Sequence, residues 1–460
     1  LSAGAVGKAQ IREIGSRLEP LVDDFLIERT EGVSLELHRP IPREVAFVFD
    51  APWEGNTSAY VTLFRDGDRF RMYYRGSRIY DPVRDAGQPG APERTCLAES
   101  ADGIVWKRVE VNRYEFEGIG RNNIVWEGIG TSDFAPLKDG NPNCSADARY
   151  KAIGAQGRRL YAFRSPDGID WSMFQDEPVL TEGRFDSQNV ALWHPLHRRY
   201  EEFHRNMRDG FRDVQMCSST DFLHWSKPRW LDWGNAPSEH LYTNAITIYQ
   251  RAPHIYLGFP MRFNPSRQGN HKTHGGVSDG QFMTSRDGLH WHRWIDAFVR
   301  PGPHPWQWVS HNNLIAWGIL RTKSSVPGSP DELSLYVNEG YFVGPCRLRR
   351  HTLRLDGFVS VHASASGGEM VTHPLVFAGT TLTMNFATSA AGGIRVEIQD
   401  AGGRPIEGFA LADATEIYGD EIERIVSWKS GTDVSRFAGK PIRLRFALKD
   451  ADLYAIQFRP

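Results

Sequence analysis

The chain has 460 residues, of which 40% are hydrophobic and 24% are charged, a composition typical of globular proteins and not of disordered ones. Its 54 basic and 56 acidic residues give a net charge of −2, which argues against a nucleic-acid or anionic-membrane partner, because both need a basic excess. No apolar run approaches the roughly 18 residues that a membrane-spanning helix requires, so we expect no membrane span.

Two further features of the composition favour an all-β fold. Aromatic residues make up 12% of the chain, and there are 44 Gly and 27 Pro, which suits many short strands joined by tight turns. The four cysteines lie far apart without a Cys-x-x-Cys pair, which argues against a zinc cage or a disulfide scaffold. The chain starts at Leu1 and has no basic-then-apolar leader, so a signal peptide is either absent or removed, and the compartment stays open.

One internal repeat organises most of the chain. The pattern Ser-x-Asp-Gly-x-x-Trp occurs at residues 100–106, 165–171 and 285–291, and it recurs at 219–225 with Phe in place of Gly. Asp-Gly favours hairpin turns, because Gly accepts a positive φ and Asp bonds to the nearby backbone. Each copy therefore predicts a strand, a tight turn and a second strand that carries Trp.

In chain order, alternating strands precede these turns. We expect strands at 60–64 and 70–74 before the first copy, at 190–193 and 200–203 before the third, and at 245–249 and 254–257 before the fourth. Units of four antiparallel strands are typical of propeller blades. A fifth unit, at 313–317, 333–336 and 347–350, lacks the Trp pattern. We therefore predict a five-bladed β-propeller over residues 1–354, with 21–28 as a candidate closing strand.

The pattern changes after about Leu355. Alternating runs at 381–386, 394–398 and 442–446 predict strands of a second all-β unit. The simplest interpretation is a C-terminal β-sandwich over residues 355–460. Additional propeller blades are the alternative, but they lack the support of Trp turns.

The propeller predicts where a site would lie. The segments that lead into the inner strands share one face with the loops between second and third strands, and the Trp turns lie on the opposite face. Long loops on the first face are expected at 75–94, 259–279 and 322–332, and loops longer than about 12 residues are usually functional or disordered. They predict a walled pocket over the mouth of the tunnel.

Carboxylates precede the inner strands of four blades, namely Glu54, Asp133, Asp186 and Glu239. Each alone is often only a turn or cap residue, but four in register predict convergence on the propeller axis. Convergent carboxylates repel one another, so at least one pKa should rise while others stay ionised. One protonated acid beside one carboxylate is what cleavage of a glycosidic bond requires.

Sugars also need planar donors and aromatic platforms. Arg75 and Arg262 follow second strands and should face the site, where guanidinium groups bind hydroxyls or a carboxylate. Each candidate also has a structural interpretation, such as a surface ion pair for Arg or packing for Trp. Asp279 before Gly280 is a further candidate acid. The candidate substrate-binding residues are Trp53, Arg75, Asp133, Asn189, His240, Asn244, Arg262 and Glu339.

Histidines do not indicate a catalytic metal. His271 and His274 lie in an expected loop, and no His-x-x-x-His occurs. No Gly-x-Gly-x-x-Gly follows a strand, and no P-loop is present. We therefore expect no cofactor and no catalytic metal, with a structural cation near the tunnel left open.

These features together resemble the five-bladed propeller glycoside hydrolases of families 32, 43 and 68. The segments that carry the resemblance are Leu-Val-Asp-Asp-Phe-Leu-Ile-Glu at 21–28, Phe-Asp-Ser-Gln-Asn-Val at 185–190 and Glu-His-Leu-Tyr-Thr-Asn at 239–244. The resemblance implies Glu239 as general acid, Asp186 as base or stabiliser and Glu54 as the third catalytic carboxylate. The Asn-Asp-Pro-Asn-Gly, Arg-Asp-Pro and Glu-Cys signatures of fructan-cleaving members are absent, so fructoside specificity is not implied.

The sequence thus predicts an exo-acting glycosidase that takes an oligosaccharide or polysaccharide. A lyase or transglycosylase on the same scaffold is one alternative, and a non-catalytic carbohydrate-binding propeller is another. The sugar, the linkage, the stereochemical outcome and the oligomeric state are not fixed by the sequence.

Overall fold

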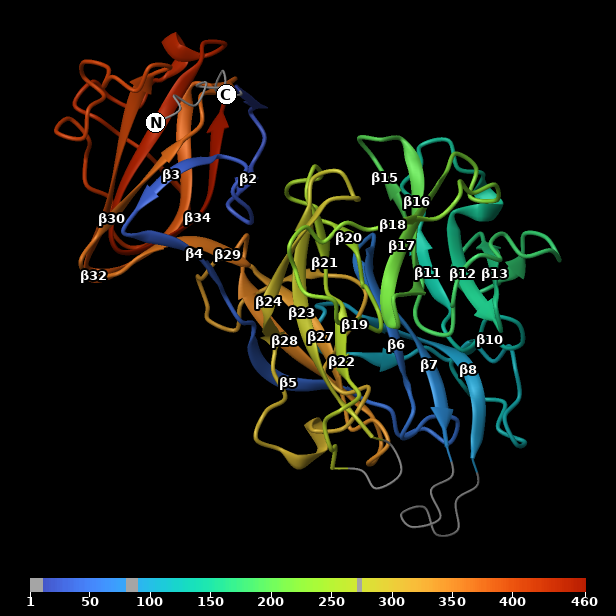
Figure 1. Ribbon diagram of the computed structural model, residues 1–460. Helices are drawn as coiled ribbons and strands as arrows, with labels where there is room; N and C mark the ends of the chain where they lie inside the picture. The colour runs from blue at the N-terminus through green and yellow to red at the C-terminus, as the bar shows by residue number, and fades with distance from the viewer. Residues whose placement is uncertain (1–10, 80–89, 271–274) are drawn as a thin grey trace. The chain divides into compact units, whose positions relative to one another are not determined.

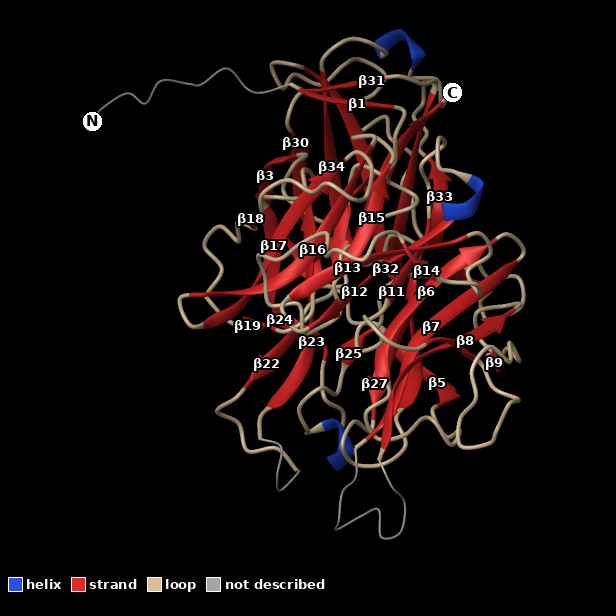
Figure 2. Cartoon of the chain, turned by 90° about the vertical axis from the view of Figure 1, so that its right-hand side faces the viewer, coloured by secondary structure: helices blue, strands red, loops and turns tan. Residues whose placement is uncertain are grey.

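The protein is almost entirely β-structure. The computed structural model describes residues 11–79, 90–270 and 275–460, and Figures 1 and 2 show strands and loops with only a few short helices. The chain forms two compact units, one of residues 40–352 and the other of residues 1–39 and 353–460. Among the described residues, no helix has the length and apolarity needed to cross a bilayer.

The larger unit is a five-bladed β-propeller, as predicted, with one antiparallel sheet per blade. The first blade contains β6 (Ala59–Asp66), β7 (Arg69–Arg78), β8 (Ala91–Ser100), β9 (Lys107–Arg108) and β10 (Ile124–Trp126). The second contains β11 (Ala135–Lys138), β12 (Tyr150–Gln156), β13 (Arg159–Ser165) and β14 (Ser172–Met173). The third contains β15 (Val190–His194), β16 (Arg199–Arg208), β17 (Phe211–Ser219) and β18 (Arg229–Trp230).

The last two blades have interrupted inner strands. The fourth blade contains β19 (His240–Leu241), β20 (Thr247–Ile248), β21 (Tyr256–Gly258), β22 (Met261–Asn264), β23 (Val277–Ser285) and β24 (Trp291–Val299). The fifth contains β25 (Leu314–Ile315), β26 (Leu320–Thr322), β27 (Glu332–Glu339), β28 (Arg347–Arg354) and β5 (Ile41–Val48). The β5 strand comes from the start of the unit, so it closes the last blade.

The N-terminal segment differs from the prediction. The residues just before β5 form β3 (Ile27–Glu31) and β4 (Val33–Leu37), which pair with β30 and β29 of the smaller unit. Residues 21–28 therefore do not close the propeller; β5 does so, by pairing with β28. The first 39 residues thus belong with the C-terminal unit, unlike the predicted domain of residues 1–354.

The repeated turns have the predicted chemistry. In the second copy, Asp167 Oδ1 accepts the N–H groups of Ile169 and Asp170, both at 2.8 Å, while Gly168 adopts φ +80°. The indole of Trp171 donates to the Gly168 carbonyl at 3.0 Å and closes the turn. In the third copy, Phe222 takes the left-handed conformation with φ +72° and is fully buried.

The loops on the site face match the prediction only in part. Residues 323–331 join β26 to β27, the first to the second strand, so the predicted long loop of the fifth blade lies on the opposite face. The β27–β28 connection is the short segment 340–346. The predicted loops 75–94 and 259–279 lie partly outside the described residues, and His271 and His274 lie wholly outside them.

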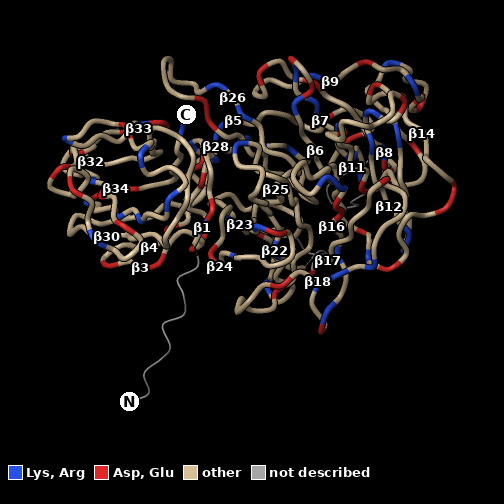
Figure 3. The backbone as a smooth tube through the Cα atoms, turned by 90° about the horizontal axis from the view of Figure 1, so that it is seen from above, with Lys and Arg blue, Asp and Glu red and all other residues tan. Residues whose placement is uncertain are grey.

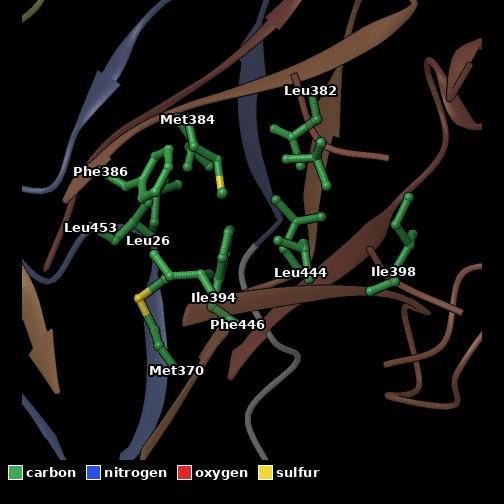
Figure 4. Packing of buried hydrophobic residues seen from close by; sticks show 14 of the residues in the cluster. Leu26, Met370, Leu382, Met384, Phe386, Ile394, Ile398, Leu444, Phe446 and Leu453 are labelled. Atoms are coloured by element: carbon green, nitrogen blue, oxygen red, sulfur yellow. The ribbon is translucent and has the colours of Figure 1, made fainter. Parts of the chain in front are cut away.

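The smaller unit is one hydrogen-bonded sheet of ten strands. Besides β3 and β4 it contains β1 (Arg12–Gly15), β2 (Glu19–Pro20), β29 (Val359–Ala363), β30 (Gly368–Thr372), β31 (Leu375–Phe377), β32 (Thr381–Asp400), β33 (Asp420–Ile425) and β34 (Ile442–Arg459). Figure 4 shows Met370, Phe386, Ile394 and Phe446 pointing into its core. The expected strands at 381–386, 394–398 and 442–446 are confirmed within β32 and β34, and the β-sandwich stays a prediction.

Candidate functional site

Side chains from all five blades form a closed ring where the inner strands begin. We call this set the axial ring; its members are Tyr60, Arg75, Asp133, Asp186, Asn189, Arg205, Tyr242, His311 and Tyr341. Contacts run from blade to blade and return to the first. Every member lies close to the start of an inner strand, either on that strand or on a neighbouring strand or loop. The ring therefore marks the mouth of the propeller.

Arg75 joins three blades. Its Nη2 donates to the carbonyl of Thr57 at 2.8 Å and to the phenol of Tyr341 in the fifth blade at 2.7 Å. Its Nη1 donates to the carbonyl of Ser132 in the second blade at 3.3 Å. The guanidinium carbon lies 4.6 Å from the centre of the Tyr60 ring, a cation–π contact. Arg75 therefore organises the site, with little of its surface left for a substrate.

Asp186 is the exposed acid of the axial ring. Its side chain is 71% exposed, and it pairs with Nη2 of Arg205, whose side chain is only 5% exposed. The guanidinium of Arg205 in turn lies 4.5 Å from the ring centre of Tyr242 in the fourth blade. A solvent-facing carboxylate held from beneath by a buried guanidinium is well placed to meet a substrate.

Asp133 and Asn189 form the buried side of the ring. The Asn189 amide donates to Asp133 Oδ2 at 2.6 Å, and the N–H of Ala155 donates to Asp133 Oδ1 at 2.7 Å. Burial raises the pKa of Asp133 well above its ordinary value, and the charges of Glu93 and Asp186 add to this effect. The predicted rise in pKa among convergent carboxylates thus occurs here, but Asp133 is only 1% exposed and out of a substrate's reach.

The backbone of the ring is strained. Tyr60 and His311 adopt φ values of +51° and +63°, although neither is glycine. Such conformations cost of order 1–3 kcal/mol each and cluster at functional sites. His311 stacks on Tyr341 at 5.1 Å between ring centres and lies 4.8 Å from Tyr242, which completes the ring between the fourth and fifth blades.

A pocket of about 960 Å³ lies on the fourth blade and brings two carboxylates together. We call it the fourth-blade pocket; its lining includes Glu239, His240, Arg262, Phe263, Asp279 and Trp308. Arg262 links the acids, since its Nε and Nη2 donate to Asp279 at 2.9 and 2.6 Å and its Nη1 donates to Glu239 at 3.0 Å. Glu239 and Arg262, each a candidate from the sequence, therefore lie in contact, and Asp279 joins them.

The two acids of this pocket differ in their surroundings. Glu239 also accepts from Gln281 at 3.2 Å and from Arg293 at 2.5 Å, so donors occupy both of its oxygens. Burial raises the pKa of Asp279, and the charge of Glu239 raises it further, while Arg262 opposes the rise. Asp279 is therefore the candidate proton carrier of this pocket.

His240 connects the pocket to the axial ring. Its Nδ1 accepts the backbone N–H of Arg212 at 3.1 Å, and burial together with the Arg212 charge lowers its pKa. The Arg212 guanidinium lies 5.2 Å from the Tyr242 ring centre and 5.5 Å from that of Phe263, which lines the pocket. The two parts of the site are therefore contiguous.

Glu54 and Trp53 lie away from the site. The Glu54 carboxylate has no exposed surface and accepts from Tyr74 at 2.5 Å, from Arg108 at 2.6 Å and from the Ala51 N–H at 3.0 Å. Trp53 is 5% exposed, and its indole donates to Asn123 at 2.9 Å. Neither side chain offers a surface to a substrate.

Asn244 and Glu339 are also buried by structural partners. Asn244 donates to the Phe203 carbonyl at 3.1 Å and accepts from the Ile246 N–H at 3.1 Å. Glu339 accepts from Arg349 at 2.8 Å and from Gln307 at 3.0 Å. The sequence predicts both residues at the mouth of the propeller, but their side chains bond to neighbouring strands and loops of the blades.

Two groups of donors could be considered for a metal ion. His194, His197 and Glu201 lie close together, but His194 Nδ1 accepts two backbone N–H groups, so its Nε2 carries the proton and cannot ligate. Glu202, His204 and Cys217 form a second group, and Glu202 Oε1 and His204 Nε2 have no hydrogen-bond partner among the described residues. The expectation of no metal stays a prediction.

Several residues of the axial ring are not among the candidates that the sequence offers. They are Tyr60, Arg205, Tyr242, His311 and Tyr341. Arg205 had a usable signal, since it occupies a second strand as Arg75 and Arg262 do. The aromatic members lie at the start of an inner strand, just before or between inner-strand segments, or after β27. Aromatic residues are common in all of these places, so the sequence around them carries no distinct signal.

No family model matches the chain, and no curated protein matches it. The chain is similar in structure to an N-acetylgalactosamine deacetylase from F. plautii in complex with blood group B trisaccharide (12% identity, covering 69% of this chain and 96% of that chain, TM-score 0.43). It is also similar to a family-32 β-fructofuranosidase from Bombyx mori (10% identity, covering 92% of this chain and 94% of that chain, TM-score 0.42). A third similar structure is a glycosyl hydrolase from Bacteroides ovatus (14% identity, covering 68% of this chain and 93% of that chain, TM-score 0.41). At such identities, substrate and mechanism follow only from the chain's own residues.

Proposed function

We propose that the protein is a glycoside hydrolase that works at the axial ring and the adjoining fourth-blade pocket. The observation that carries the proposal is the exposed carboxylate of Asp186 near a pocket that holds a partly buried pair of carboxylates, Glu239 and Asp279. Their chemistry matches the two tasks of glycosidic-bond cleavage, proton donation and attack on the anomeric carbon.

Each acid has a role set by its surroundings. Asp279, whose raised pKa favours the protonated form, donates its proton to the leaving-group oxygen as the glycosidic bond breaks. Asp186 takes a proton from the attacking water, or attacks the anomeric carbon itself. Glu239, held by Arg262 and Arg293, supplies a neighbouring negative charge that adds to the effect of burial in raising the pKa of Asp279.

The pocket suits a carbohydrate. A volume of about 960 Å³ is at the upper end of the roughly 300–1,000 Å³ usual for ligand pockets, large enough for more than one sugar ring. Phe263 and the half-exposed Trp308 offer aromatic faces within it, and Arg262, His240 and Ser238 offer donors. We propose an oligosaccharide substrate that is attacked from one end.

The test is digestion of a panel of oligosaccharides and aryl glycosides followed by NMR. Wild type should release a sugar, whereas Asp186→Asn and Asp279→Asn should release none and Glu239→Gln should retain part of the activity. Asp68→Asn, on an exposed hairpin away from the site, is the matched control and should behave as wild type. Release of sugar by Asp186→Asn at the wild-type rate would refute the proposal.

A non-catalytic carbohydrate-binding propeller is the second candidate. It is favoured by one observation, that both oxygens of Glu239 and of Asp279 are already occupied by arginine or glutamine donors. In that case a glycan binds, no sugar is released, and Asp279→Asn leaves binding unchanged.

A further inference from the structure

Three arginines surround the single exposed acid of the axial ring. Arg205 on β16 and Arg212 on β17 flank the tight turn of the third blade, and their guanidinium carbons lie 4.5 and 5.2 Å from the ring centre of Tyr242. The backbone N–H of Arg184 donates to the Arg205 carbonyl at 2.8 Å, which places the third arginine beside them. We call these three residues the arginine cluster.

Arg205 is incompletely paired. The residue is 4% exposed, and only its Nη2 meets a carboxylate, that of Asp186. Its Nε and Nη1 are buried and have no hydrogen-bond partner among the described residues. A buried guanidinium with unsatisfied N–H groups is costly, because these groups have lost water and gained nothing in return.

Arg212 and Arg184 also lack acidic partners. In the part of the chain that the structure describes, neither guanidinium takes part in a hydrogen bond or an ion pair. Burial and the charge of Arg205 lower the pKa of Arg212, which reports that like charges are held close together. Arg205 pairs only with Asp186, and the charges of Arg205 and Arg184 both act on Arg212, so positive charge exceeds negative charge within the cluster, although Figure 3 shows charges of both signs interspersed over the chain as a whole.

We propose that the arginine cluster is a subsite for an oxyanion carried by the substrate sugar, either the carboxylate of a uronic acid or a sulfate ester. Guanidinium groups bind such groups through parallel N–H donors, which the half-buried and unpaired Arg212 supplies, while the buried Arg205 adds its positive charge from the adjacent strand. A neutral hydroxyl could satisfy some of these donors but would leave the charge excess in place. The inference rests on the proposed function, since it names the substrate class of the same site.

The test measures binding, so it does not depend on turnover. Isothermal titration calorimetry of the full chain at low salt compares methyl β-D-glucuronide and glucose 6-sulfate with methyl β-D-glucoside, and inorganic phosphate serves as a free oxyanion. The variants are Arg212→Gln, which removes the charge, and Arg212→Lys, which keeps the charge but loses the fork. Arg65→Gln is the control, because it makes the same charge change at an exposed position near the end of β6, away from the mouth.

We expect at least one acidic sugar to bind about tenfold or more tightly than the neutral glycoside, since hydrogen bonds to charged groups are the strong ones. Arg212→Gln should abolish this preference, Arg212→Lys should retain part of it, Arg65→Gln should preserve it, and added salt should weaken it. If the neutral glycoside binds as tightly, if the preference survives Arg212→Gln, or if no Arg212-dependent anion binding is found, the proposal is overturned. If free phosphate binds more tightly than either acidic sugar, the proposal is also overturned, because the arginine cluster would then be a site for a free anion and not for a group of the sugar.

The two proposals fail in different ways. If acidic sugars bind but no sugar is released, the hydrolase proposal is refuted and the proposal of an oxyanion subsite is retained. A product with the ultraviolet absorbance of an unsaturated uronate would replace hydrolysis by a lyase reaction at the same subsite. Hydrolysis of neutral glycosides alone would keep the hydrolase proposal and remove the subsite.

Discussion

The guanidinium of Arg75 in the first blade donates a hydrogen bond of 2.7 Å to the phenol of Tyr341 in the fifth. This bond closes the axial ring from the side of the site, while β5 closes the fifth blade by strand pairing. The same guanidinium also reaches the second blade at Ser132. One buried cation therefore holds three blades at the mouth, where the ring residues need fixed positions.

Tyr341→Phe should destabilise the propeller. The change removes one hydrogen bond to a charged group, and such bonds contribute roughly 1.5–3 kcal/mol to the free energy of unfolding. Urea denaturation followed by tryptophan fluorescence measures the shift. Tyr418→Phe is the control, because Tyr418 is 71% exposed in the smaller unit and should leave the midpoint unchanged. Equal midpoints for the two variants would show that the Arg75–Tyr341 bond does not stabilise the fold.

Glu54→Gln should weaken the fold without altering the chemistry. The Glu54 carboxylate has no exposed surface and pairs with Arg108, and breaking a buried pair costs about 3–5 kcal/mol. We expect a lower melting temperature and normal activity per folded molecule, measured below the melting transition. Loss of activity in a fully folded Glu54→Gln protein would return this residue to the catalytic set.

Asp186→Asn should lower the rate far more than it lowers the stability. The Asp186 side chain is 71% exposed, but its carboxylate pairs with the buried guanidinium of Arg205, so the substitution should lower the free energy of unfolding by about 1–3 kcal/mol. Loss of a catalytic base typically lowers the rate by about 10²–10⁴-fold. Parallel measurement of kcat and of the urea midpoint separates the two effects, and Asp68→Asn should match wild type in both.

The propeller could be predicted because its signals are local. The Ser-x-Asp turn and its Trp are seven residues long, and Asp167, Gly168 and Trp171 make their contacts within that span. The closing strand could not be predicted in the same way. β5 is an edge strand with Ile41 and Val48 exposed, so its sequence lacks the alternation of a strand with one buried face.

The sequence predicts site residues correctly only where their place along an inner strand decides whether they reach the mouth. Register brought Asp133, Asp186 and Arg75 to the mouth correctly, since each lies in or next to an inner-strand position. It misplaced Glu54, because the partner that sequesters this acid, Arg108, comes from a distant outer strand. Side-chain direction at such positions depends on contacts that sequence spacing does not encode.

Glu239→Gln should change the pH dependence of activity in a defined direction. A general acid must be protonated, so activity falls as the pH rises through its pKa. Glu239 contributes to the raised pKa of Asp279, and removing its charge should lower that pKa. We therefore expect the alkaline limb of the kcat/KM profile to move to lower pH. An unmoved limb, or a shift to higher pH, would exclude Asp279 as the proton donor.

Asp167→Ala should destabilise the propeller at neutral pH and lose this effect in acid. Partial burial opposes ionisation of Asp167, but the N–H groups of Asp170 and Ile169 outweigh it and lower the pKa. A carboxylate with a depressed folded-state pKa stabilises the fold above its ordinary value of 3.8 and loses that contribution as the pH falls through the folded-state pKa. By analogy with helix caps, the cost at pH 7 should be about 0.5–2 kcal/mol.

The gap in urea midpoint between Asp167→Ala and wild type should therefore narrow once the pH falls below the ordinary pKa of the carboxyl. Asp176→Ala, an exposed substitution outside the turn, should leave the midpoint unchanged at both pH values. A gap that stays constant with pH would assign the role of Asp167 to chain conformation and not to its charge. Because Asp102, Asp221 and Asp287 accept the same pair of backbone N–H groups, the same pH dependence should then be sought in the other three blades that carry the turn.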